Sequence, residues 1–230
     1  MVKIQRFTGT RIQEIIDGLE SIYIQTEEAQ KAWKAVTPFQ CEPGCGTCCV
    51  DFEPDILESE ALYLAAWMLE NQKERAIAIL EGTFMSPRLD PERGCIFFDP
   101  STPYHCTVYE GRCIICRLFG YTGDKGKDGK LRFKPCKFLP FENIKAVHAL
   151  RKQYTAEELL EYFGAIPPIM SDLTAQILCL TPDTIQERKP LREALPLALG
   201  RIVMIMRFFE QPPEPLFPEP APITPTTLAS

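Results

Sequence analysis

Hydrophobic positions recur at helical spacing in the first part of the chain. Between Thr10 and Val36, six apolar residues fall on one face of a 3.6-residue repeat. These residues are Ile12, Ile15, Ile16, Leu19, Ile22 and Tyr23. Thr10 and Gln13 also have the spacing of a capping box, in which two side chains satisfy two free amide donors. The pattern therefore predicts a long amphipathic helix that ends before Pro38.

Further helices are predicted on both sides of a middle segment. Apolar residues at helical spacing favour one helix over about 56–80. A capping box at residues 155–158 predicts a helix that continues through Phe163. A last amphipathic helix is expected over 191–209, and we expect Pro196 to interrupt it because proline lacks the amide donor that a helix interior uses.

The segment between these helices has a different pattern. Short β-like runs lie between turns at 95–98, 106–109, 118–122 and 131–133. The predicted fold class is therefore mainly α with a small irregular or β cysteine-rich insert, in a single domain plus a disordered tail. That domain covers residues 1–210 and contains the cysteine module at about 41–136. Residues 211–230 hold seven prolines and no Lys or Arg, which favours a disordered Pro-rich tail.

The N-terminal residues indicate where the protein is located. Residues 1–10 contain no apolar run of the roughly 7–15 residues that a secretory signal needs. The apolar stretch Ile202–Met206 is too short to span a bilayer. We therefore expect a cytoplasmic protein with no membrane contact.

The distribution of charge adds little to the predicted fold and location. The 230 residues include 31 acidic and 25 basic side chains, which gives a formal net charge of −6. Between Arg93 and Lys137, however, nine basic residues stand against four acidic ones, so this segment is positive. Cations near cysteines lower thiol pKa values and offset thiolate charge. A solvated basic face explains the same residues equally well. Because no basic motif with interleaved aromatic residues is present, a nucleic-acid partner is not expected.

The chain has ten cysteines and only two histidines. Nine of the cysteines fall between Cys41 and Cys136, and Cys45–Cys48 and Cys113–Cys116 are both C-x-x-C units. This spacing lets two thiolates reach one metal ion from a tight turn. In a reducing cytosol, clustered cysteines are typical of metal binding or catalysis, and disulfides are the alternative. The tenth, Cys179, lies between two leucines and is expected to be a buried apolar residue.

The identity and number of the metal ions stay open at this point. Soft thiolate ligands favour zinc, Cu(I) or an iron–sulfur centre, and the shortage of histidine argues against mixed Cys/His sites. If Cys48 and Cys49 are extended, their side chains point to opposite faces. The two thiolates would then serve two metal ions, or one metal ion and one other role, more easily than a single tetrahedral site. Two four-coordinate sites and one polynuclear cluster are both compatible with about eight ligands.

Three blocks together resemble a known family. The first block is Cys41-Glu-Pro-Gly-Cys45-Gly-Thr-Cys48-Cys49, and the second is Gly94-Cys95-Ile-Phe-Phe-Asp99. The third is Cys106-Thr-Val-Tyr109-Glu-Gly-Arg112-Cys-Ile-Ile-Cys116-Arg117-Leu-Phe119. This combination, over about residues 41–136, resembles the YkgJ-type cysteine-cluster proteins of the CxxCxxCC type. These are described as zinc- or iron-chelating domains, and their relatives include flagellin lysine-N-methylases.

The resemblance implies a metal-ligand set. Carried over by position, the metal ligands are Cys41, Cys45, Cys48, Cys49, Cys95, Cys106, Cys116 and Cys136. The family usually has proline after the arginine of the third block, whereas this chain has Cys113 after Arg112. Cys113 is therefore an additional thiol that can substitute for another ligand or compete with it.

These observations lead to one main hypothesis and two alternatives. The main hypothesis is a cytosolic metal-binding protein that chelates zinc or an iron–sulfur centre through its cysteine cluster, with no reaction assigned. The first alternative is an enzyme similar to a protein lysine methyltransferase, although the chain has no recognisable S-adenosylmethionine loop. The second is a non-catalytic, zinc-stabilised interaction module whose helices or Pro-rich tail contact a protein partner. No catalytic residue and no organic cofactor site is predicted.

Overall fold

The structure, a computed structural model, describes residues 4–41, 44–139, 153–182 and 187–210. Its helices are α1 (Arg11–Val36), α2 (Glu58–Asn71), α3 (Lys73–Leu80), α4 (Ile114–Leu118), α5 (Ala156–Phe163), α6 (Met170–Leu178) and α7 (Leu191–Glu210). Its strands are β1 (Asp55–Ile56), β2 (Asp124–Lys125), β3 (Leu131–Phe133), β4 (Tyr154–Thr155) and β5 (Lys189–Pro190). The predicted fold class, mainly helical with small antiparallel sheets and a cysteine-rich region, is confirmed. The expected tail at 211–230 lies outside the described residues.

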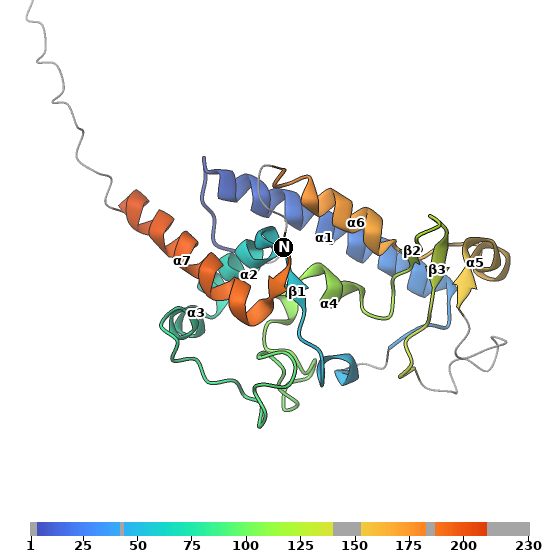
Figure 1. The fold of residues 1–230 in the computed structure, drawn as a ribbon, viewed down its shortest axis with the longest axis horizontal. Coiled ribbons are helices and arrows are strands. Elements are labelled where there is room, and N and C mark those ends of the chain that lie inside the picture. The colour runs from blue at the N-terminus through green and yellow to red at the C-terminus, as the bar shows by residue number, and fades with distance from the viewer. Residues whose placement is uncertain (1–3, 42–43, 140–152, 183–186, 211–230) are drawn as a thin grey trace, which may run out of the picture.

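Helix α2 is the centre of the main core. Its residues from Ser59 to Leu69 are all buried, which is the pattern of a helix covered on every side. Helices α1, α3 and α7 pack around it, and α6 runs beside α1 (Figure 1). The short strands β1 and β5 pair antiparallel at the base of α7 and join the start of α2 to the start of α7. This frame supports the cysteine-rich segments.

A second, aromatic core forms at the other end of α1. Strands β2, β3 and β4 form an antiparallel sheet there, next to α5 (Figure 1). The rings of Trp33, Phe39 and Phe133 pack together, with centroids 5.2–6.2 Å apart. Phe39 follows α1 and precedes Cys41, so this cluster fixes the point at which the chain enters the cysteine-rich segment.

Several predicted elements are confirmed with changed details. Helix α1 begins after Thr10, whose hydroxyl accepts a hydrogen bond from the Gln13 amide at 3.1 Å. The Gln13 side chain accepts from the amide of Phe7 and not from that of Thr10, so only half of the expected capping box forms. The box at residues 155–158 forms completely and opens α5.

Other predictions are wrong for identifiable reasons. The helix expected over 56–80 is broken at Gln72, whose backbone leaves the helical region while its side-chain amide donates to the Thr107 carbonyl at 2.6 Å. Ile56 belongs to strand β1. Helix α7 continues through Pro196, because the buried face of α7 that packs on α2 compensates for one missing backbone hydrogen bond.

The β-like runs of the cysteine-rich segment are mostly not strands. Only 131–133 forms one, as β3. Residues 95–98 and 106–109 meet at a single bridge between Phe98 and Cys106. The run at 118–122 starts at the last residue of helix α4. Runs of four or five apolar residues do not distinguish strands from buried turns, since burial alone explains them.

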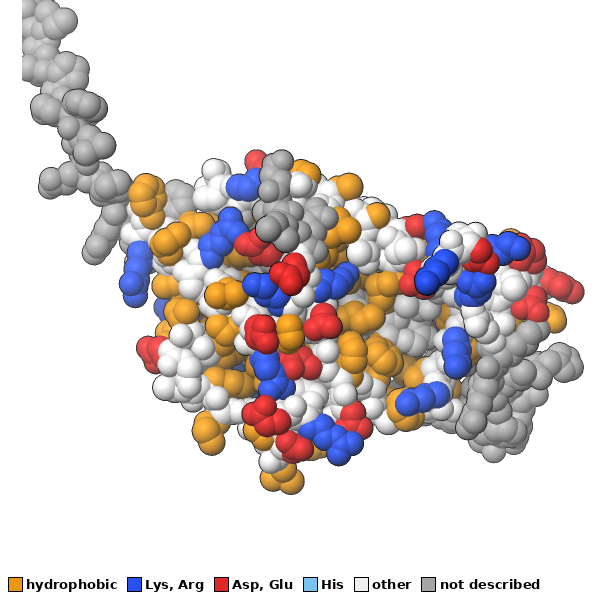
Figure 2. Space-filling model, in the orientation of Figure 1, with side chains coloured by type: hydrophobic (Ala, Val, Ile, Leu, Met, Phe, Trp, Pro, Cys, Tyr) orange, Lys and Arg blue, Asp and Glu red, His pale blue; other side chains and the backbone are white. Residues whose placement is uncertain are grey.

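On the face drawn in Figure 2, acidic and basic side chains are interspersed over the helices. Within the described ranges, no helix has the length and apolar character needed to cross a membrane.

Candidate metal centre

The Cys48–Cys49 pair is held in a tight turn. Residues Thr47–Cys49 form a single 3-10 turn, so the pair is not extended as the sequence argument assumed. The two Sγ atoms are 3.8 Å apart. Two sulfurs bound to one tetrahedral zinc ion, with Zn–S bonds of about 2.3 Å, are separated by about the same distance. The turn therefore brings both thiols to one location, and the two thiol groups described below adjoin at this pair.

Two glycines allow the cysteine-bearing segments to approach each other closely. Gly94 has φ +81°, and a Cβ atom on it would lie 2.8 Å from the carbonyl oxygen of Val50. A Cβ atom on Gly46 would lie 2.2 Å from Nδ1 of His105. Each glycine or its contact partner is next to a cysteine in the sequence. The loop that carries Cys49 is thus pressed against the segments that carry Cys95 and Cys106.

Four thiols form what we call the first thiol group. Its members are Cys41, Cys45, Cys48 and Cys136. Burial raises the pKa of Cys41, and the nearby thiolates of Cys45 and Cys48 raise it further. Burial also raises the pKa of Cys136, which is in turn affected by all three of the others. These mutual effects show that segments separated by almost a hundred residues converge here.

Residues outside the motif fix the first thiol group in place. The Tyr121 hydroxyl accepts a hydrogen bond from the Cys41 amide at 2.8 Å. Lys34, on α1, lies over the Tyr121 ring with its Nζ 3.9 Å from the centroid. Burial lowers the pKa of Lys34, while the Cys41 thiolate raises it. Lys34 was not among the predicted site residues, because no local spacing links α1 to Cys41.

Five thiols form the second thiol group. Its members are Cys49, Cys95, Cys106, Cys113 and Cys116. The Sγ atoms of Cys113 and Cys116 are 3.3 Å apart. Burial raises the pKa of Cys95 to about 12, and the thiolates of Cys106 and Cys113 raise it further. Contact with Cys113 is the main reason why the pKa of Cys116 is raised, followed by burial and by the nearby Cys95 and Cys49.

A buried carboxylate connects the second thiol group to the helical core. Glu60, on α2, is 1% exposed, and its Oε1 accepts a hydrogen bond from the Ile114 amide at 2.8 Å. This amide belongs to the first residue of α4, where a helix has unpaired donors. Burial raises the pKa of Glu60, and Arg188 opposes that effect from 3.5 Å. Glu60 was not among the predicted site residues. The signal that could have identified it is an acidic residue inside an otherwise apolar helix.

The arginines near the cysteines have different roles. Arg112 lies 3.5 Å above the Tyr109 ring and lowers the pKa values of Cys48, Cys49 and Cys106, so its charge acts on both groups. Its Nε is buried and has no hydrogen-bond partner among the described residues.

The side chain of Arg117 is directed away from the thiols. It is buried, forms an ion pair with Glu27, and donates to the Arg112 carbonyl at 2.8 Å. Arg117 therefore fixes the backbone of the third block and does not face the thiols.

The two thiol groups differ in their access to solvent. Cys45 is exposed, whereas Cys113 is 2% exposed. A cavity of about 430 Å³ is lined by Cys48 and Cys136 of the first group, together with Lys134 and Lys137. The first group thus includes an exposed thiol and borders a cavity, whereas the second includes a buried thiol next to the helical core. The other thiols of both groups are half-buried.

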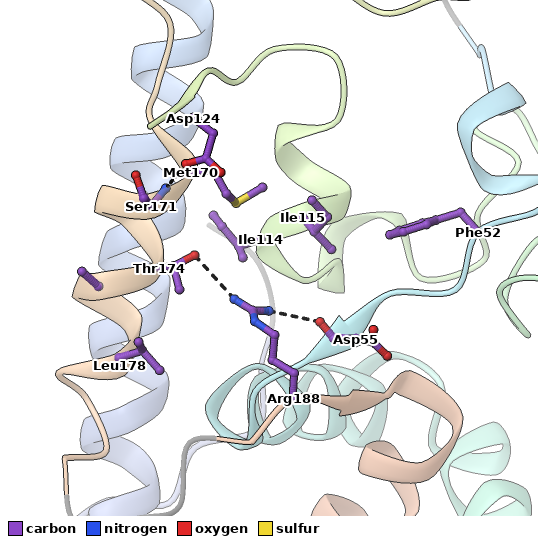
Figure 3. Close-up of a pocket in the computed structure, with 11 residues that line it drawn as sticks. Phe52, Asp55, Ile114, Ile115, Asp124, Met170, Ser171, Thr174, Leu178 and Arg188 are labelled. Carbon is purple, nitrogen blue, oxygen red and sulfur yellow. Dashed lines mark hydrogen bonds between the residues drawn. The ribbon is translucent and has the colours of Figure 1, made fainter. Parts of the chain in front are cut away.

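A second cavity lies on the far side of α4. It has a volume of about 540 Å³ and is lined by Ile114 and Ile115 of α4 and by residues of α6, as Figure 3 shows. Arg188 crosses it, donating to the Asp55 carbonyl at 3.1 Å and to the Thr174 hydroxyl at 3.5 Å. None of the cysteines lines this cavity.

The donor set fits a thiophilic metal. All ten cysteines are free thiols, and the sulfur atoms are 3.8 Å apart in the Cys48–Cys49 pair and 3.3 Å apart in the Cys113–Cys116 pair. In the part of the chain that the structure describes, no three or more His, Cys, Asp or Glu side chains are already arranged to hold a metal ion. Binding must therefore draw the converged thiols closer together.

The eight predicted ligands all fall within the two groups, four in each. Whether they bind metal stays a prediction. Cys113, which stands where the family usually has proline, is the fifth member of the second group. The prediction for Cys179 is wrong, because this residue is exposed at the end of α6. Only Ile177 of that helix is fully buried, and Cys179, two positions later, points away from the core.

Comparison with protein families gives one match. Residues 40–152 match the CxxCxxCC family, whose description is "Putative zinc- or iron-chelating domain". The chain carries a domain of this family. The YkgJ-type resemblance is thereby confirmed, and the family's chelating description agrees with a zinc or iron–sulfur cofactor of unresolved identity. No curated protein and no solved structure matches the chain.

The close approach at Gly94 yields a test of how the CxxCxxCC domain is assembled. Gly82 and Gly94 both have positive φ, but a Cβ on Gly82 would meet no atom within 4 Å. Gly82→Ala should lower the free energy of unfolding only by the cost of holding alanine in the left-handed backbone conformation, about 1–2 kcal/mol. Gly94→Ala should cost more and should also lower the zinc or iron content, because it separates Cys95 from Cys49. Urea unfolding and elemental analysis measure both effects, and equal effects of the two variants would contradict this account.

Proposed function

We propose that the protein binds zinc or iron through a sulfur-only centre made of the two thiol groups. The first group contributes Cys41, Cys45, Cys48 and Cys136, and the second contributes Cys49, Cys95, Cys106 and Cys116. The observation that supports this best is the convergence of nine thiols from four separate segments. Such an arrangement costs free energy in the absence of metal, because buried thiols and thiolates replace solvated ones. Metal binding offsets this cost.

The difference in burial supports a different role for each group. The second group lies against the helical core and is anchored through Glu60, so a metal ion there would join the core to the cysteine-rich loops. In such a structural site, protein ligands fill all four coordination positions. The first group borders a cavity with two lysines, so a metal ion there would be accessible to exchange or to a small ligand.

When bound, the metal supplies a charged centre that links four protein segments. The protein side chains do the rest. Arg112 offsets thiolate charge for both groups, and Lys34 does so for the first. Tyr121 holds the backbone at Cys41 in place. These contacts orient the thiols and compensate the negative charge that four thiolates bring to a divalent ion.

A cytoplasmic location is part of the proposal. It is supported by the chemistry of the centre, because thiolate ligands must stay reduced and the cytosol keeps thiols reduced. A protein partner that contacts the helices or the Pro-rich tail stays a prediction.

The proposal predicts metal content and a staged release of metal. Anaerobically purified protein should contain zinc, or iron with labile sulfide, bound by both groups. Titration with a chelator such as EDTA should first remove the metal of the accessible group while the far-ultraviolet circular dichroism signal persists. Removal of the remaining metal should lower the melting temperature and loosen the cysteine-rich segment, since structural metal binding is partly folding free energy.

Two results would overturn this proposal. A chain purified without oxygen that contains neither zinc nor iron, and does not take up either after reduction, would exclude the function. Release of all metal in one step with no change in melting temperature would exclude the division into accessible and structural sites. Cys179→Ser serves as the matched control, because Cys179 is exposed and outside both groups.

Metal affinity should depend strongly on pH. Burial raises the pKa values of Cys41, Cys95, Cys106 and Cys136, so these thiols hold their protons at neutral pH in the metal-free chain. Each must lose a proton to bind metal, and higher pH therefore favours binding. Zinc affinity should rise between pH about 6 and about 8, with proton release that a pH indicator detects in weak buffer. Affinity that is independent of pH over this range would contradict thiolate ligation.

A further inference from the structure

The second thiol group contains one thiol more than a tetrahedral metal ion can bind. Cys49, Cys95, Cys106 and Cys116 of this group belong to the ligand set that the resemblance implies, and these four already satisfy four-coordinate zinc or iron. Cys113 is the fifth, and it replaces the proline that the resemblance leads one to expect at this position. Its presence in the group has to be explained by its geometry.

The position of Cys113 makes it equivalent to Cys116 as a ligand. Its Sγ lies 3.3 Å from that of Cys116, well within the separation of two sulfurs that share a metal ion. Cys113 and Cys116 also share Cys95 as a neighbour, because the pKa of Cys95 is raised by Cys113 and the pKa of Cys116 is raised by Cys95. Both sulfurs therefore lie on the side of the second group that faces Cys95.

The backbone around Cys113 is fixed independently of any metal. Cys113 is the residue before the first turn of α4, and the next amide, that of Ile114, donates to the buried Glu60. Arg117 donates to the Arg112 carbonyl on the other side. Cys113 is also 2% exposed, so it is protected from reagents in solution.

We propose that Cys113 and Cys116 are interchangeable ligands of the second metal site, so that one of them is always a spare thiol. This inference rests on the proposed function. In the exchange, the bond between the metal and the Cys116 sulfur breaks as one to the Cys113 sulfur forms. The proton that Cys113 gives up passes to the released Cys116 thiolate, so charge and proton number are unchanged. The second site can thus loosen one bond without losing its metal.

The experiment compares single and double substitutions in the full chain. Zinc-reconstituted Cys113→Ser, Cys116→Ser and the double variant are analysed for zinc per chain under anaerobic conditions. The double variant Cys95→Ser/Cys106→Ser serves as the reference for a second group left with three thiols, and Cys179→Ser as the neutral control. Circular dichroism establishes that each variant is folded.

Both single variants should keep the zinc content of the wild type. The double variant should lose the metal of the second site, as Cys95→Ser/Cys106→Ser does. Loss of zinc in Cys116→Ser as complete as in Cys95→Ser/Cys106→Ser would overturn the inference, because Cys113 would then be an inert core thiol. Full zinc content in the double variant would also overturn it. A wild-type chain that binds no zinc or iron would instead end the proposed function itself.

Discussion

The close contact between two backbone segments is the constraint on which the rest of the centre depends. The loop that carries Cys45, Cys48 and Cys49 lies directly against the segments that carry Cys95 and Cys106, at distances that leave no room for a side chain at Gly46 or Gly94. The contact at Gly94 is made by backbone atoms and the contact at Gly46 by the side chain of His105, so both position the thiols before any metal binds. Metal binding then needs only to draw together sulfurs that are already neighbours.

The helical core determines the difference between the two thiol groups. Helix α2 is buried on all sides and holds Glu60, which binds the first amide of α4 and so fixes the second group against the core. The first group lies farther out, at the end of α1, where Tyr121 and Lys34 contact Cys41. Arg112 acts on members of both groups. One chain thus offers a protected sulfur environment and an accessible one side by side.

Local signals in the sequence predicted local structure well. The capping box at residues 155–158 forms because both of its hydrogen bonds lie within one turn. The break at Gln72 could not be predicted, because it is stabilised by a contact with Thr107 that no nearby residue indicates. The error at Pro196 has the same origin, since burial of α7 against α2 outweighs a local preference.

In the candidate site too, the sequence predicted some features, and others depend on tertiary contacts. The resemblance selected the cysteines that the structure brings together, but it could not divide them into two groups. That division depends on the 3-10 turn at Thr47–Cys49 and on the packing of α4. Cys179 shows the opposite failure, because two flanking leucines indicated burial for a residue that lies at an exposed helix end.

X-ray absorption spectroscopy at the metal edge of the anaerobically purified full-length chain tests the central claim most directly. A sulfur-only centre predicts a first shell of about four sulfur atoms per metal at about 2.3 Å, with no nitrogen or oxygen ligand. A first shell dominated by nitrogen or oxygen would contradict the account, because it would place the metal away from the converged thiols.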